Sequence, residues 1–591
     1  MLKIFKSRSW WLKISVVSAG LMCQPVFATE ADSQFETLAE DIWQYRLQQS
    51  PLSANYYGIE VKPAQMPDLS TATLKSEYNK TLSQLEQLNG VDVTQLSEQN
   101  RINLAVLTHR LQNVADNFKF NAHQIPITAE GGFHTSLGFL PGITQFNNKQ
   151  DFNNYLSRLE QFPRYFTQQI NWMRQGLKAG NSQPQVVLQG YEQSIDGYLT
   201  KEVKDNPFYR PFLRDYDFLS AEEKASLDKR AEDVVKSKVE VAYQYFRDFM
   251  LEEYIPEARE SIGVSETPEG KNFYANRARH YTTTDLSPEQ IHDLGLEQVK
   301  RIRSEMAEII KQVNFKGDFA DFLQFLRSDP QFYAKTPEQL LMKASYISKQ
   351  MDAKLPALFK HLPRTPYGVA PVPDHIAPKY TTGRYVGASK DTDAGYYWVN
   401  TYALDRRPLY ELEALTLHEA VPGHHLQISL SREMENTPLY RSSYYISAFG
   451  EGWGLYAEWL GLEAGFYQDP YSNFGRLTYE MWRACRLVVD TGMHVMGWSR
   501  QQAIDYMKQN SALSEHNITT EVDRYISWPG QALSYKIGEL TIRKLRKKAE
   551  EKLGKDFDVR EFHYQVLKNG SVPLSILEQQ IDDYLAKAKN Q

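Results

Sequence analysis

The chain has 591 residues, of which 42% are hydrophobic and 24% are charged, and its formal net charge is −6. This length predicts two or more domains, or one large composite unit, with a sizeable buried core. Residues 1–28 contain four positive charges and no negative ones, so the chain without them would have a net charge of −10. An acidic balance of this size argues against nucleic acid as the partner.

The first 28 residues have the organisation of a secretory signal peptide. Basic residues precede the apolar run Ile14–Met22, and the segment Val26–Ala28 has the small-x-small form of a signal-peptidase site. We predict cleavage after Ala28 and a periplasmic or secreted protein. The alternative is a lipoprotein signal at Cys23, although Met22 is a poor fit to the small residue expected before such a cysteine. The apolar run is short for a membrane span, and no integral membrane span is predicted in the mature chain.

Helical periodicity dominates the rest of the chain and predicts a mainly α fold. In the first predicted helix, 34–49, the apolar residues Phe35, Leu38, Ile42 and Tyr45 recur at helical spacing. Further helices are predicted at 151–179, 220–254, 287–313, 336–359, 443–465, 474–498, 500–511, 530–551 and 574–588.

The composition changes at 363–395, where Pro, Gly, Thr and Asp accumulate. These residues break helices and favour turns, so we expect a domain boundary or a long irregular insertion here. We place an N-terminal helical region at 29–362. The second helical region, 363–591, carries the metal motif described below and is the predicted catalytic region.

An aromatic and β-branched run from Ala394 to Tyr402 predicts a strand. It forms a small β element immediately before the helix that carries His418. Two interpretations remain open for it. It is either an edge strand that holds an extended peptide by main-chain hydrogen bonds or a small structural hairpin.

The segment Leu417–Gln427 contains three histidines and one glutamate, and it predicts a metal site. In the common zinc signature two histidines lie at i and i+4 on one helical face, with a glutamate beside the first acting as base. Here His424 follows His418 by six positions, which on an ideal helix turns it about 240° away. Pro422 removes a helical N–H and Gly423 permits unusual backbone angles, so the helix must bulge or break between His418 and His424.

A bulge that absorbs two residues would bring His424 to the place of the second ligand, whereas one that absorbs three would bring His425 there. Glu419, beside His418, is the candidate base. A third ligand is expected from another element, leaving an open position for water. Glu451 and Glu458 can share one face of a later helix; one would bind the metal and the other would orient a ligand histidine.

Further downstream, His494, Tyr525 and Tyr535 are candidate donors to the oxyanion that forms when water attacks a carbonyl. The alternative is that these side chains belong to the core, as most of the 36 tyrosines must.

The motifs resemble a bacterial family of proteins of unknown function, DUF885, whose hallmark HEAxPGHHxQ stands here at 418–427. The resemblance extends to YYWVNT at 396–401, FGEGWGLYAEW at 449–459, RLVVDTGMH at 486–494 and RYISWPGQALSYKIG at 524–538. The family is similar to gluzincin peptidases, and the segment at 449–459 resembles the stretch where oligopeptidases of the thimet type place a glutamate ligand. This implies Glu451 as the ligand. Those peptidases also have a glycine directly before the second ligand histidine, which matches His424. The resemblance further implies a large helical gluzincin-like fold with a deep cleft that admits peptides.

We therefore predict an exported zinc metallopeptidase that cleaves short peptides, in which His418, His424 and Glu451 hold Zn²⁺ and Glu419 deprotonates the water. One alternative is a periplasmic peptide-binding protein with a catalytically degenerate site. A di-iron carboxylate bundle needs two Glu-x-x-His pairs, and the chain has only Glu289 with His292.

Overall fold

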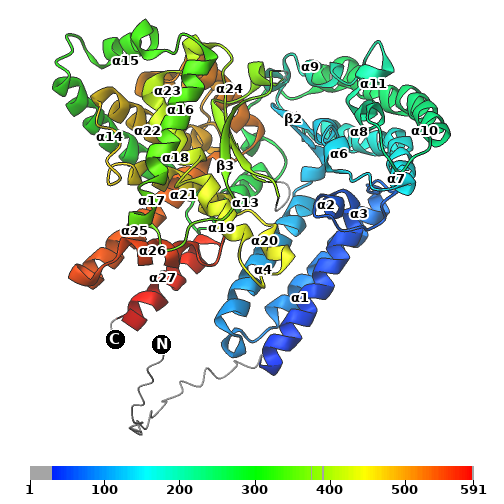
Figure 1. The fold of residues 1–591 in the computed structure, drawn as a ribbon, viewed down its shortest axis with the longest axis horizontal. Coiled ribbons are helices and arrows are strands. Elements are labelled where there is room, and N and C mark those ends of the chain that lie inside the picture. Colours follow the sequence, from blue (N-terminus) through cyan, green and yellow to red (C-terminus); the bar gives the residue numbers. More distant parts are fainter. Residues whose placement is uncertain (1–28, 375, 389–391, 589–591) are drawn as a thin grey trace, which may run out of the picture.

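The computed structural model describes residues 29–374, 376–388 and 392–588, so the predicted signal peptide lies outside the described residues. The mainly α fold is confirmed, with small sheets among the helices. Figure 1 shows the first half of the chain on the right and the second half on the left, with a small sheet between them. No described helix is both long enough and apolar enough for a membrane span.

The first half is mainly helical and contains the β1–β2 hairpin, which joins Ile127–Thr128 to Gly131–Gly132. Its helices are α1 (Glu30–Gln49), α2 (Pro51–Tyr56), α3 (Thr71–Asn89), α4 (Glu98–Lys119), α5 (Phe133–Leu137), α6 (Leu140–Ile143), α7 (Lys149–Glu160), α8 (Phe162–Ala179), α9 (Gln193–Asp196), α10 (Ala221–Val234), α11 (Glu240–Phe249) and α12 (Ile255–Glu257).

The second half contains the longer helices and the motif. Its helices are α13 (Gly270–Thr282), α14 (Pro288–Gln312), α15 (Phe319–Ser328), α16 (Pro337–Asp352), α17 (Leu355–Leu358), α18 (Leu412–Glu419), α19 (His424–Arg432), α20 (Leu439–Ser442), α21 (Ser447–Leu460), α22 (Pro470–Val495), α23 (Arg500–Asn510), α24 (Glu515–Ser527), α25 (Ser534–Leu553), α26 (Val559–Leu567) and α27 (Leu574–Ala588). The helices α13, α15, α20, α24 and α26 were not predicted from the sequence.

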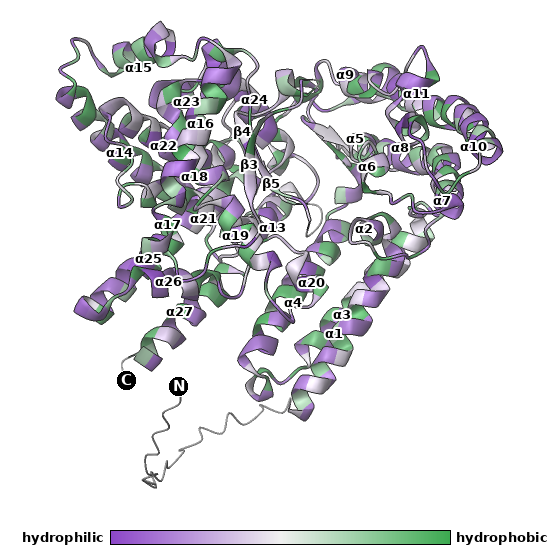
Figure 2. Ribbon diagram, viewed as in Figure 1, coloured by the Kyte–Doolittle hydropathy of each residue, from purple (hydrophilic) through white to green (hydrophobic). Residues whose placement is uncertain are grey.

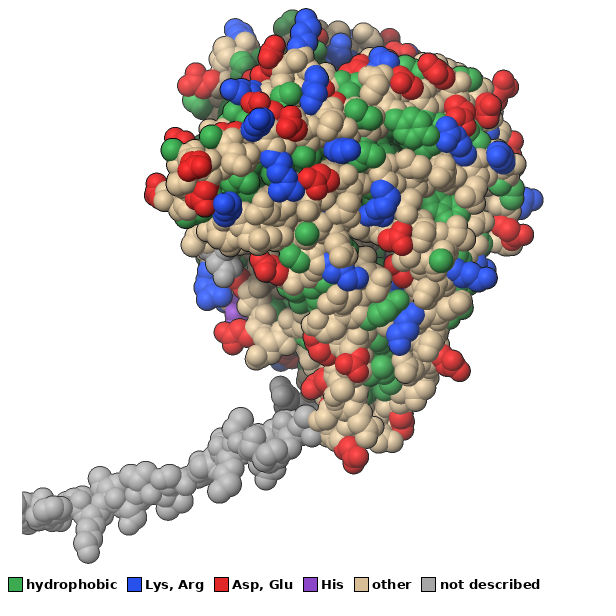
Figure 3. All heavy atoms as spheres, turned by 90° about the vertical axis from the view of Figure 1, so that its right-hand side faces the viewer, with side chains coloured by type: hydrophobic (Ala, Val, Ile, Leu, Met, Phe, Trp, Pro, Cys, Tyr) green, Lys and Arg blue, Asp and Glu red, His purple; other side chains and the backbone are tan. Residues whose placement is uncertain are grey.

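Helix ends and faces follow local chemistry. Ser220 and Ser287 each cap the helix that follows, and a Glu or Gln three residues on bonds back to the capping residue. Along the ribbon in Figure 2, hydrophobic and hydrophilic residues alternate around most helices. This is the pattern of helices that bury one side. On the face shown in Figure 3, Lys and Arg side chains are interspersed with Asp and Glu.

The main hydrophobic core runs from Met66 to Leu585 and includes residues of both halves. Within it α14 lies along α22, and α21 packs on α25. A second apolar cluster joins α1, α3 and α4, and Tyr440 of α20 packs into it. The boundary expected at 362/363 stays a prediction.

The small sheet lies beside the metal motif. Strand β3 (Tyr367–Pro371) pairs in parallel with β5 (Gly395–Val399), and β4 (Gly383–Val386) pairs antiparallel with β5. The strand order is β3-β5-β4, so the predicted strand is real but is central. Its interpretation as an edge strand was wrong, because the segment at 363–395 supplies a partner on each side. The edge strand next to α18 is β4.

Candidate metal centre

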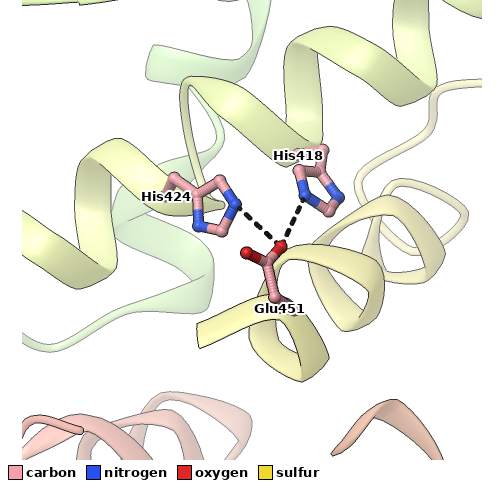
Figure 4. A group of neighbouring side chains, drawn as sticks. All are labelled: His418, His424 and Glu451. Carbon is pink, nitrogen blue, oxygen red and sulfur yellow. Dashed lines mark ion pairs between the residues drawn. The ribbon is translucent and has the colours of Figure 1, made fainter. Parts of the chain in front are cut away.

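Three helices bring the predicted metal ligands together. His418 lies at the end of α18, His424 is the first residue of α19, and Glu451 is on α21. Their ligand atoms all lie within 4.8 Å of one another. Glu451 Oε2 is 3.7 Å from Nε2 of His418 and 3.4 Å from Nε2 of His424, and Figure 4 shows both rings turned toward this carboxylate.

The helix breaks completely between the two histidines. α18 ends at Glu419 and α19 begins at His424, with the peptide bond before Pro422 in the cis form. The indole N–H of Trp453 donates to the Pro422 carbonyl at 2.8 Å, which ties the break to α21. Gly423 is required here, because a Cβ at this position would lie 1.9 Å from the carbonyl oxygen of His418. The motif therefore consists of two separate helices, whereas a single helix with a bulge would also have been compatible with the sequence.

His425 points away from the cluster. Its Nδ1 lies 3.0 Å from the Tyr385 hydroxyl, and its ring packs against Tyr367 with the centroids 4.5 Å apart. Burial lowers the pKa of His425 to about 4. Of the two adjacent histidines, the structure therefore brings His424 to His418 and Glu451.

Glu458 supports His418 from behind. The Nδ1–H of His418 donates to Glu458 Oε1 at 2.7 Å, which leaves Nε2 as the nitrogen that faces Glu451. Arg483 lies 3.3 Å from the same Glu458 oxygen. Gly454 allows this packing, since a Cβ there would come within 2.7 Å of the His418 ring. Burial lowers the pKa of His418, but Glu451 and Glu458 outweigh it and raise the pKa to about 10. The same negative field favours a bound cation.

The candidate base is anchored to the sheet. Glu419 is half-buried at the end of α18, and the main-chain N–H of Tyr385 in β4 donates to its Oε2 at 2.8 Å. The described residues form no hydrogen bond to Oε1. One oxygen is thus fixed by the backbone, and the other is available to accept a proton.

Tyr445 is a site residue that the sequence analysis missed. Its hydroxyl donates to Glu451 Oε1 at 3.1 Å. Its side chain is 43% exposed, yet desolvation by surrounding protein and the nearby Glu451 raise its pKa well above 10. The one signal for this residue was its place just before FGEGW, in a chain with 36 tyrosines.

Tyr535 also lies at the centre. Its ring stacks on His418 with the centroids 6.5 Å apart, and the Arg486 guanidinium lies 4.2 Å from the ring centroid. The side chain is 9% exposed.

His494 and Tyr525 have their polar atoms engaged elsewhere. His494 accepts from the Val264 N–H through Nδ1 at 3.1 Å and donates to the Tyr525 carbonyl through Nε2 at 3.0 Å. The Tyr525 hydroxyl accepts from Trp482 and Arg486, and the residue is 1% exposed. Both side chains are buried and bonded to other parts of the protein, and their role as oxyanion donors stays a prediction. Neither residue is carried into the proposal below.

The sequence matches one protein family, and the fold matches solved structures. The chain belongs to the family described as "Bacterial protein of unknown function (DUF885)", whose profile matches residues 51–581. It is similar to a solved structure described as "the putative lipoprotein from Colwellia psychrerythraea", with 30% identity, a TM-score of 0.86, and coverage of 95% of this chain and 100% of the other. A second, "a putative lipoprotein of unknown function from Shewanella oneidensis", is 19% identical with a TM-score of 0.71, covering 92% of this chain and 99% of the other. No curated protein matches the chain.

Proposed function

We propose that the chain is an exported zinc-dependent hydrolase that cleaves short peptides. The observation that carries the proposal is the convergence of His418, His424 and Glu451, with Glu419 adjacent to the first of them. Two imidazole nitrogens and one carboxylate oxygen form the ligand set of catalytic zinc sites, which keep a further position open. The second carboxylate, Glu458, holds His418 as the outer partner of a metal-binding histidine does.

A bound zinc ion would supply Lewis acidity, which lowers the pKa of a water molecule and polarises the scissile carbonyl. The chain's own residues do the rest. Glu419 accepts the proton of the attacking water on Oε1, while the Tyr385 N–H holds its other oxygen in place. β4 is the edge strand beside this carboxylate, and its main-chain groups other than the Tyr385 N–H can hold an extended peptide by hydrogen bonds.

Tyr445 and Tyr535 supply the hydrogen-bond donors. The raised pKa of Tyr445 keeps its phenol protonated at neutral pH, so its hydroxyl can donate to the oxyanion as it develops. Tyr445 already donates to Glu451, so its hydroxyl lies within reach of the metal position.

Replacing Tyr445 by Phe is expected to lower kcat by about 10²- to 10³-fold, the usual cost of losing one oxyanion donor. The zinc content should stay the same, because the three ligands remain. Tyr402→Phe is the control, since Tyr402 is 48% exposed and lies after β5. Unchanged kcat in Tyr445→Phe would leave Tyr535 as the donor.

Export is supported by the organisation of residues 1–28. The solved relative that is 30% identical is described as a putative lipoprotein, which supports the Cys23 alternative to cleavage after Ala28. Either route delivers the catalytic region outside the cytoplasm, where short peptides are the proposed substrates. The alternative function, a degenerate peptide-binding protein, uses the same site without hydrolysis.

The test combines metal analysis with digestion of a peptide library. Protein purified without added metal is expected to contain about one zinc per chain. Mass spectrometry of the library should then show cleavage that chelation abolishes and zinc restores. A folded, zinc-supplemented protein without metal would refute the proposal. A loaded protein that retains peptides intact would favour the peptide-binding alternative.

A further inference from the structure

A small cavity lies in the first half of the chain, apart from the metal centre. Its lining comes from three segments: residues within 55–63 at and after the end of α2, residues 144–145 after α6, and residues within 151–158 on α7. In Figure 1 these elements lie at the right of the molecule, whereas the helices that carry the metal ligands lie in the left-hand part. The cavity has a volume of about 70 Å³, several times the roughly 10–15 Å³ that one water molecule needs. It can therefore hold a molecule of several heavy atoms.

Arg158 on α7 lines this cavity and is a buried cation without a partner in the described chain. The residue is 2% exposed, yet no described residue forms a hydrogen bond or an ion pair with its guanidinium. Its Nε and Nη2 are both buried and unbonded. Desolvation lowers the pKa of Arg158 to about 10, so the group keeps its charge at neutral pH.

The other buried arginines that the structure describes all have polar partners. Each donates to an asparagine side chain or pairs with a glutamate: Arg277, Arg441, Arg476, Arg483, Arg486 and Arg546. A buried charge is strongly unfavourable unless hydrogen-bonded partners compensate it. At Arg158 the described chain supplies no such partner, and the cavity leaves room for one from outside.

The rest of the lining indicates which anion fits. Gln145 and Asn154 contribute side-chain amides whose oxygens accept hydrogen bonds and whose nitrogens bond to no described residue. Two carboxylates, Glu60 and Asp151, also line the cavity, and neither forms an ion pair with Arg158. One cation and two carboxylates together repel a doubly charged anion such as phosphate. They favour a singly charged carboxylate, and more strongly one that also carries an ammonium group.

We propose that this cavity binds the carboxylate of a small molecule, a free amino acid or a short organic acid, and that Arg158 is the group that holds it. A guanidinium binds a carboxylate by two parallel hydrogen bonds. The chain uses this geometry elsewhere, where Nε and Nη2 of Arg500 donate to the two oxygens of Asp523 at 2.6 and 2.9 Å. The same two atoms of Arg158 are the ones that lack a partner. The cavity shares no residue with the metal centre, so this site does not depend on the proposed function.

The test follows thermal unfolding of the whole protein at constant ionic strength. Alanine and propionate should each raise the unfolding midpoint in a saturable way, because a ligand that binds only the folded state stabilises it. Alaninamide lacks the carboxylate and should raise it much less, as should sodium phosphate. Tighter binding of alanine than of propionate would identify an amino acid as the ligand, and the reverse order would identify an organic acid.

Variants of one residue locate the binding. Arg158→Met should weaken the binding of both carboxylates by about 10- to 100-fold, the usual effect of a hydrogen bond to a charged group. Without ligand this variant should be at least as stable as the unaltered protein, because an apolar side chain replaces a buried charge that has no partner. Arg158→Lys keeps the charge but loses the fork of donors, so its affinity should be intermediate. Arg214→Gln, which removes an exposed charge in the same half of the chain, should bind like the unaltered protein.

The same variants exclude binding at the metal centre. A carboxylate that binds a metal ion there would shift the unfolding midpoint of Arg158→Met as much as that of the unaltered protein. Equal shifts in these two proteins would overturn the inference, and so would the absence of a shift with either carboxylate. Stabilisation by phosphate that requires Arg158 and exceeds that by both carboxylates would overturn the choice of ligand. If Arg158→Met does not fold, Arg158→Lys takes its place, and unchanged affinity there would refute the paired hydrogen bonds.

Discussion

Glu419→Gln is expected to lower kcat by about 10²- to 10⁴-fold, which is the contribution of a positioned general base. The amide has the shape of the carboxylate and can still accept from the Tyr385 N–H, but it cannot take the proton of the attacking water. The metal should remain, since none of the three ligands changes. Elemental analysis and peptide kinetics on the same preparation measure both results.

The matched control is Glu435→Gln, an exposed carboxylate in the loop after α19. It should change neither zinc content nor kcat. If Glu419→Gln keeps its activity, another residue is the base, and the anchoring of Glu419 by β4 is structural.

The second large effect separates His424 from His425. Removing the His424 imidazole takes away one of three ligands, so His424→Ala should weaken zinc binding by more than the 10- to 100-fold cost of losing an outer partner. His425→Ala should keep the metal and lose stability, because His425 packs on Tyr367 and lies within hydrogen-bond distance of Tyr385. Competition with a zinc chelator measures the affinity, and thermal unfolding measures the stability.

The outcome is decisive in either direction. A protein that loses zinc in His425→Ala and retains it in His424→Ala would mean that α19 rotates when the metal binds. Equal losses would mean that the segment 420–423 depends on both rings.

The helices were predictable where their apolar residues repeat. The periodicity of Phe35, Leu38 and Ile42 places α1 correctly, because one face of that helix is buried. The sheet was only partly predictable. The aromatic run located β5, but β3 and β4 are short, and their pairing is set by contacts with distant residues that the local sequence does not encode.

The candidate site was also predictable only in part. His418, His424 and Glu451 stand out because few other roles explain their types and spacing, and the structure groups them. Tyr445 is ordinary in the sequence, and only its hydrogen bond to Glu451 of α21 gives it a place at the centre. The backbone bonds that engage His494 likewise come from segments far away in the chain.

The break at 420–423 also affects how such centres are recognised. In a continuous helix the number of residues between two ligands is dictated by the 3.6-residue turn. Here each histidine takes its orientation from its own helix, and the connecting loop only has to span the gap. Ligand spacing along the chain is thereby uncoupled from ligand position in space. A search that demands one fixed interval would pass over this arrangement, whereas a search for His-Glu before a Pro-Gly break would find it.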